Sequence, residues 1–144
     1  MNRRFRLGSV LRARQAQEDA ARSAVLRARA EANRAAEHQV QTEHTLSERD
    51  VPDHADSLAF VAAQAARQAL AAELSAAAMA TASADAAVED RMGELTTAAV
   101  RRRAMEKLAE RHADDVRKAD ARAGQHQLDE LAGARRGNPG GGDR

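Results

Sequence analysis

The only strong break in the helix-forming pattern before the C-terminal tail is the stretch Ser47-Glu48-Arg49-Asp50-Val51-Pro52-Asp53. Pro52 disfavours helical geometry at Val51, and the carboxylate of Asp50 or Asp53 can cap the start of a new helix. Because the connection is short, long helices on its two sides must run antiparallel. The sequence therefore predicts an all-α fold, an antiparallel two-helix coiled-coil hairpin whose second helix is longer than its first.

The first helix-forming segment, at about residues 5–47, carries an apolar stripe with the alternating spacing of four and three residues that is typical of coiled coils. Eight of its twelve positions are apolar, and Arg14 and Glu18 are its charged interruptions. The twelve positions are Leu7, Leu11, Arg14, Glu18, Ala21, Val25, Ala28, Ala32, Ala35, Gln39, Thr42 and Leu46.

A second stripe begins near Phe60 and runs through a segment without proline, which predicts one helix at about residues 57–132. Its polar exceptions include Arg67, Thr81, Arg91, Arg102 and His112. Its apolar positions are Ala63, Leu70, Leu74, Ala77, Ala84, Val88, Leu95, Ala98, Met105, Ala109, Val116, Ala119 and Ala123. With a turn at about residues 48–56, residues 1–132 form a single helical hairpin. The glycine-rich residues 133–144 have nothing to pack and are expected to be a disordered tail.

The register of the hairpin follows from the turn. If Ser47 faces Ser57, everything beyond Val100 projects past the end of the first helix. Residues 58–88 contain 16 alanines among 31 residues. This composition favours close packing of the two helices, and a smooth docking surface for another helix is the alternative.

The composition excludes most other folds. The chain has two Phe and no Trp, Tyr or Cys, and 37 of its apolar residues are alanine. The chain is poor in the bulky and β-branched residues from which β-sandwiches, β-barrels and parallel sheets are built. The absence of cysteine excludes disulfide frameworks and thiolate zinc sites. No apolar run reaches the length of a membrane span.

The net charge of +1 conceals a strong pattern along the chain. Residues 1–34 carry +6, residues 35–60 carry −5, residues 61–99 carry −3 and residues 100–144 carry +3. A hairpin turns this pattern into a rod with a basic end and an acidic tip. The candidate partner-facing residues of the basic end are Arg3, Arg4, Arg6, Arg101, Arg102 and Arg103.

The basic end suits an acidic partner surface. Nucleic-acid binding is the competing use, but no aromatic side chain accompanies the arginines and acids are interleaved with them. Phe60 is the single large aromatic near the acidic tip. We expect Phe60 in the seam between the helices, with a partner contact as the alternative.

The sequence offers little for catalysis. The five histidines lack a metal-binding spacing, and the adjacent acids lie on solvated helices without a pocket that could separate their pKa values. We therefore predict a non-enzymatic protein with no catalytic residues, metal, cofactor or small-molecule substrate.

Two terminal stretches resemble one known family. Residues 5–14 read Phe-Arg-Leu-Gly-Ser-Val-Leu-Arg-Ala-Arg and are followed by Glu18-Asp19, and residues 125–132 read Gln-His-Gln-Leu-Asp-Glu-Leu-Ala. Together with the length and the short-then-long helix order, they resemble the flagellar export protein FliJ family. In that family an F-x-L-x-x-V-L phrase opens the chain, and a Gln-basic-x-Leu-Asp-Glu-apolar-Ala phrase closes it.

The resemblance implies a component of the bacterial flagellar type III export apparatus, needed for flagellum assembly and motility. It implies a stalk that binds the hexameric export ATPase, the cytosolic domain of the export gate protein and the export chaperones. It also implies a cytoplasmic protein that reaches the inner membrane only through these partners. The alternatives are a generic coiled-coil adaptor, an injectisome stalk component and, less favoured, a basic nucleic-acid-associated helical protein.

Overall fold

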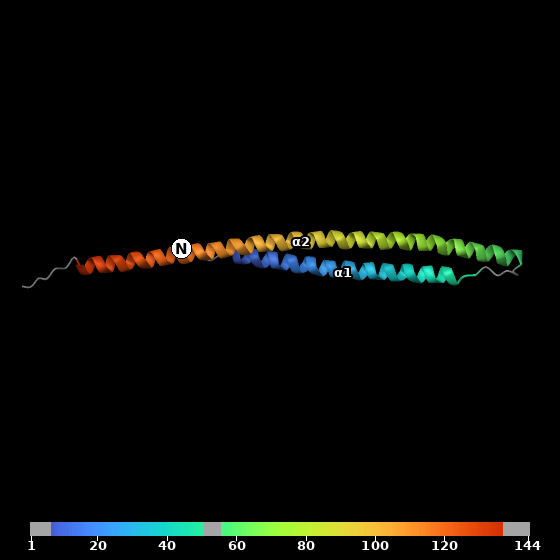
Figure 1. Cartoon of the computed structure of the whole chain (residues 1–144), viewed down its shortest axis with the longest axis horizontal. Coiled ribbons are helices and arrows are strands. Elements are labelled where there is room, and N and C mark those ends of the chain that lie inside the picture. Colours follow the sequence, from blue (N-terminus) through green and yellow to red (C-terminus); the bar gives the residue numbers. More distant parts are fainter. Residues whose placement is uncertain (1–6, 51–55, 137–144) are drawn as a thin grey trace, which may run out of the picture.

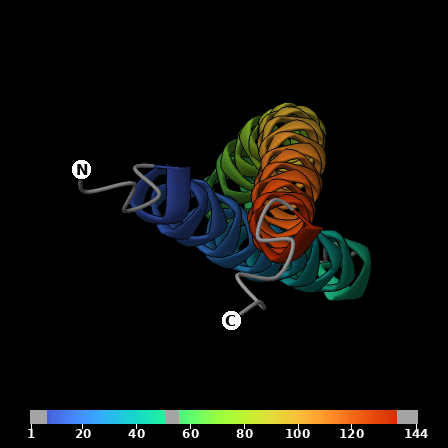
Figure 2. The same cartoon turned by 90° about the vertical axis from the view of Figure 1, so that its left-hand side faces the viewer.

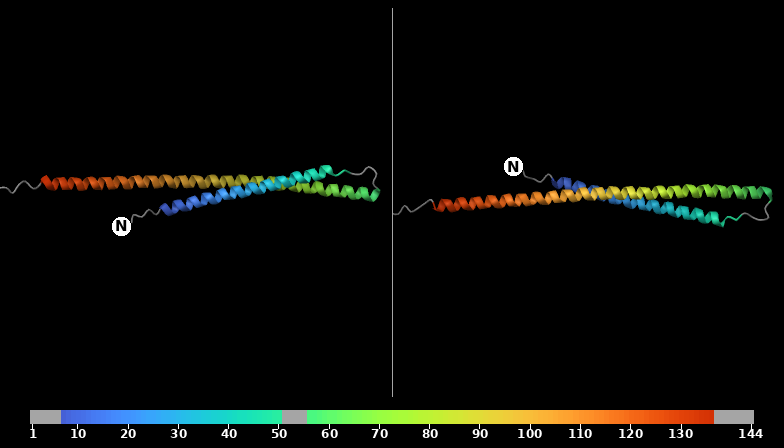
Figure 3. Two further views of the ribbon diagram at one scale, coloured as in Figure 1. Left: turned by 90° about the horizontal axis from the view of Figure 1, so that it is seen from below. Right: turned by 45° about the horizontal axis from the view of Figure 1, so that its top comes forward.

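The protein is an antiparallel hairpin of two helices (Figure 1), seen in a computed structural model that describes residues 7–50 and 56–136. Helix α1 spans Leu7–Glu48 and helix α2 spans Ser57–Arg136. At about 1.5 Å per residue, α1 is about 63 Å long and α2 about 120 Å long. The helices lie side by side and cross at a shallow angle (Figures 1 and 3). The predicted all-α hairpin with a longer second helix is confirmed.

The seam on α1 follows the predicted stripe. All twelve positions of the first stripe are buried or half-buried, and nearly every other α1 residue is exposed. The most buried apolar side chains are those of Val25, Ala28 and Ala32. Small residues at these positions let the two helices approach closely, so a thin seam supplies the whole core of the molecule.

The seam on α2 matches the second stripe between Leu70 and Val116. Its apolar positions in this range are buried or half-buried, and Ala77 is the most buried of them. Ala119 and Ala123 are exposed. The stripe pattern continues beyond Val116, but α1 provides nothing there for it to pack against.

The register differs from the one predicted from the turn. Glu18 contacts Arg102, whereas a pairing of Ser47 with Ser57 would set Glu18 opposite about residue 86. At the other end, Nη1 of Arg67 donates a hydrogen bond to the carbonyl oxygen of Arg49 over 2.8 Å. The end of α1 therefore lies near Arg67, and the first ten residues of α2 extend beyond it.

The predicted start of the overhang at Val100 is consequently wrong. Half-buried residues continue to Val116, and every described side chain after it is exposed. The segment that projects past α1 comprises residues 117–136, called the projecting segment below. It is about 30 Å long. The prediction failed because it assumed a tight turn, whereas α2 begins well outside the end of α1.

Local interactions set the helix ends. Oδ1 of Asp56 accepts a 2.7 Å hydrogen bond from the backbone N–H of Ala59, so Asp56 is the N-cap of α2. Asp50 does not fill this role, and Asp53 lies outside the described residues. The helix α2 continues to Arg136, four residues past its expected end, because alanine and arginine favour helix and one exposed glycine costs only about 1 kcal/mol. Of the expected disordered tail, residues 137–144 lie outside the described residues.

Replacement of Val25 by alanine tests the seam. Val25 is 5% exposed, and its neighbour Leu26 is 62% exposed. We expect Val25→Ala to lower the free energy of unfolding by about 1.5 kcal/mol, because about two buried methylene equivalents are lost. Leu26→Ala is the control and should change stability by less than about 0.5 kcal/mol. Circular dichroism melts would measure both, and equal effects would contradict the assignment of the seam.

Candidate functional site

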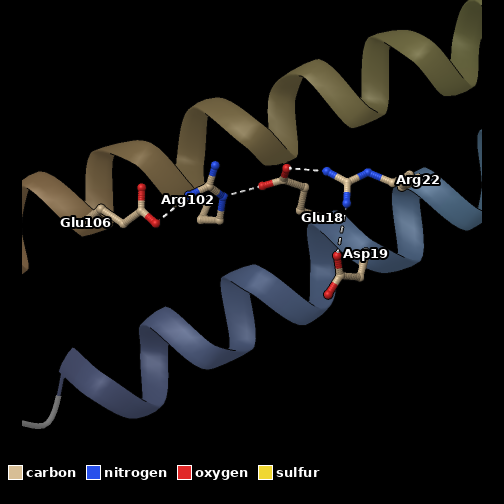
Figure 4. A network of polar contacts seen from close by, with 5 residues as sticks. All are labelled: Glu18, Asp19, Arg22, Arg102 and Glu106. Carbon is tan, nitrogen blue, oxygen red and sulfur yellow. Dashed lines mark hydrogen bonds and ion pairs between the residues drawn. The ribbon is translucent and has the colours of Figure 1, made fainter.

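A cluster of five charged side chains joins the two helices near the N-terminal end of α1 (Figure 4). We call this cluster the polar layer. It consists of Glu18, Asp19, Arg22, Arg102 and Glu106. Glu18 occupies a seam position and is only 8% exposed, which is unusual for a carboxylate. The heptad spacing places Glu18 in the seam, so its charge must be matched there.

Arg102 of α2 is the partner that crosses between the helices. Its Nε donates to Oε2 of Glu18 and its Nη1 donates to Oε1 of Glu106. Arg22 supports Glu18 from the same helix, through a 3.2 Å hydrogen bond from Nη2 to Oε1. Nη1 of Arg22 also lies 3.6 Å from Oδ1 of Asp19. Glu18 is thus held by one arginine from each helix.

The electrostatics of the polar layer are those of a fixed ion pair. The hydrogen bonds to Glu18 and then to Glu106 raise the pKa of Arg102 above its usual value. Like other arginine side chains, Arg102 is charged across the neutral range. Among the described residues, every buried side-chain nitrogen or oxygen has a hydrogen-bond partner. This arrangement can hold the two helices together.

The structure describes only part of the predicted basic end. Arg101 and Arg103 are exposed, whereas Arg102 points into the polar layer. Because Arg102 contacts Glu18, these arginines are level with the third and fourth turns of α1 and not with its first turn. Arg3, Arg4 and Arg6 lie outside the described residues. The sequence prediction gathered them with Arg101, Arg102 and Arg103 only through the incorrect register.

Phe60 is 50% exposed and does not lie in the seam, which corrects its expected placement. It belongs to the part of α2 that extends beyond α1, so no residue of α1 covers it. Leu58 and Val61 beside it are 79% and 62% exposed. We call Leu58, Phe60 and Val61 the α2 tip. Sequence analysis missed Leu58 and Val61, although three large apolar residues within four positions ahead of an alanine-rich stretch were a visible signal.

The projecting segment is a single solvated helix at the opposite end of the molecule (Figures 1 and 2). Leu128 and Leu131, one helical turn apart, are 63% and 64% exposed. Local contacts support the helix, including a hydrogen bond of 3.3 Å from Nε2 of Gln125 to Oδ1 of Asp129. A helix with all sides open presents its charges and its two leucines to any surrounding surface.

Two further findings concern the described residues as a whole. No group of three or more His, Cys, Asp or Glu side chains in residues 7–50 and 56–136 is arranged to hold a metal ion. Neither described helix contains an apolar stretch long enough to cross a membrane.

Comparison with known proteins gives one match. A family model described as "Flagellar FliJ protein" matches residues 3–141, which is nearly the whole chain. No curated protein and no solved structure matches at a significant level. The matched range includes both terminal stretches on which the resemblance in the sequence rested, and that resemblance is confirmed.

Proposed function

The chain belongs to the flagellar FliJ protein family, a non-enzymatic component of the flagellar export apparatus, and from this membership we propose that it is a stalk for the hexameric export ATPase. The observation that carries this proposal is the projecting segment, a single helix that extends beyond the paired part of the rod. Residues 117–136 form a helix of about 30 Å that no other part of the described chain covers.

The shape and the chemistry of this end suit insertion along the axis of a ring. An axial shaft needs length and an uneven surface, and it needs no pocket. The exposed Leu128 and Leu131 offer apolar contacts, and the charges around them offer contacts of both signs. Lone helices of this length are marginal in water, so a surrounding partner would stabilise the projecting segment.

The proposal extends to the other partners of the apparatus. The cytosolic domain of the export gate protein and the export chaperones would bind the remaining length of the rod, where Arg101 and Arg103 are exposed on α2. The α2 tip, with Phe60, is a further surface for one of them. Through these partners the protein would act in the cytoplasm at the inner membrane, without catalysing a reaction itself.

The direct test combines the purified chain with the export ATPase of the same organism. We expect binding, together with a rise in the hexamer fraction or in ATP turnover, measured by analytical ultracentrifugation and phosphate release. In a separate assay with the gate protein or a chaperone, the double variant Arg101→Glu/Arg103→Glu should weaken binding to an acidic partner surface at least about tenfold with unchanged helicity. Arg27→Glu/Arg34→Glu, on exposed α1 positions, is the matched control. If the chain neither binds nor stimulates the ATPase at low salt, the proposed role is refuted. If the two double variants bind with equal affinity, Arg101 and Arg103 do not belong to the interface.

A further inference from the structure

The seam of the hairpin does not by itself choose one register. Alanine is the commonest residue in both stripes, and their spacings of three and four repeat every seven residues. Sliding α1 by seven residues along α2 therefore returns seam positions to seam positions and buries nearly the same apolar area. Coiled coils of this kind need a polar device to select one alignment.

Most polar side chains in the seam cannot provide that selection, because they bond within their own helix. Nη1 of Arg14 donates to Oε1 of Gln17 over 2.9 Å. The hydroxyl of Thr42 donates to the carbonyl oxygen of His38 over 2.9 Å, and that of Thr81 donates to the carbonyl of Ala77 over 3.1 Å. These bonds survive any sliding of one helix along the other.

Contacts at the edges of the seam are also weak selectors. Nε2 of His38 lies 3.7 Å from Oε1 of Glu73, and both side chains are more than half exposed. If the helices slid, these two groups would return to water at little cost, because exposed pairs contribute little.

Glu18 and Arg102 differ because both lie within the seam. The side chain of Glu18 is 10% exposed and that of Arg102 is 24% exposed. A slip of one heptad would place Glu18 against Leu95 or Ala109, and a slip of two heptads against Val88 or Val116. Each of these residues is a half-buried apolar seam residue. In each of these four registers Glu18 loses Arg102 and keeps only Arg22 of its own helix, so a nearly buried carboxylate would lie on an apolar residue of α2, which is unfavourable.

We propose that the pair of Glu18 and Arg102 fixes the register of the hairpin and thereby the lengths of its two protruding ends. A slip of one heptad in one direction would lengthen the projecting segment by seven residues, about 10 Å, and shorten by the same amount the start of α2 that extends beyond α1. A slip in the other direction would have the opposite effect on both ends. The pair therefore determines how far α2 extends beyond each end of α1, independently of which partners bind these ends.

Spin labels can measure the register, because the chain contains no cysteine. The exposed positions Ala13 and Ala80 would be changed to cysteine and labelled. In the observed register they lie about 40 Å apart along the rod, and a slip of one heptad changes this distance by about 10 Å in either direction. Pulsed electron resonance should show one distance for the otherwise unchanged chain.

The informative variant is Glu18→Leu/Arg102→Leu, which replaces both charges by apolar side chains. Such replacements often keep or raise stability, so loss of register is separated from loss of folding. We expect unchanged helicity and additional distances displaced by about 10 Å. Glu18→Ala/Arg102→Ala gives the same readout if the leucine pair aggregates. Thr42→Val/Thr81→Val is the control and should keep the single distance. One unchanged distance in a folded charge-free variant would overturn the proposal.

Discussion

Deletion of residues 117–144 is expected to abolish stimulation of the export ATPase while leaving the hairpin folded. Every described side chain of α2 beyond Val116 is exposed, so the deletion removes no buried side chain of the seam. The helical signal in circular dichroism should fall by about a sixth, because 20 of the 122 residues in the two helices are removed. The melting temperature of the remainder should stay within a few degrees.

A point variant shows whether stimulation depends on the helical structure of the projecting segment or only on the length of the chain. Ala123→Pro keeps every other residue but breaks the projecting segment, at a cost of about 3 kcal/mol to that helix. We expect it to stimulate the ATPase as poorly as the deletion. ATP turnover with the two variants gives the comparison. Full stimulation by the deleted chain would show that another part of the rod engages the ATPase.

Replacement of Ala77 by proline is expected to abolish cooperative folding of the hairpin. Ala77 is 6% exposed and is the most buried of the described residues of α2. Proline removes a backbone hydrogen bond, clashes with the preceding turn and costs about 3 kcal/mol or more. The added ring also forces the helices apart at a position that fits only a small side chain.

The same substitution at two positions makes this prediction specific. Ala123→Pro has the same local cost but lies outside the seam, so its melt should resemble that of the unchanged chain apart from a smaller helical signal. Ala77→Pro should instead lose the cooperative transition, because the hairpin has no second core on which to rely. A melt of Ala77→Pro that matches that of Ala123→Pro would mean that the seam contributes little to stability.

The elements and the seam could be predicted from the sequence because they depend on local spacing. The stripe from Leu7 to Leu46 identified every buried residue of α1, including the polar Glu18 and Thr42. A residue's place on a helix face depends only on its own helix. The break at Pro52 likewise follows from backbone sterics.

The register could not be obtained in the same way, because it depends on which charges meet across the seam. The second stripe contains Arg67, Arg91 and Arg102 as charged exceptions, and each could in principle face Glu18. Alanine positions do not discriminate between these pairings. The assumed tight turn decided the choice incorrectly, and the misplacement of Phe60 followed from it.

The N-terminal end of α1, which lies near Val116 of α2, also has a mechanical consequence. Up to this point two helices share any bending load, and beyond it α2 bears the load alone. Bending stiffness rises steeply with the width of a beam. The paired region is therefore stiff, and the projecting segment bends more easily. Torque or thrust applied to the projecting segment would be absorbed there first, and the paired region would transmit the remainder as a nearly rigid lever.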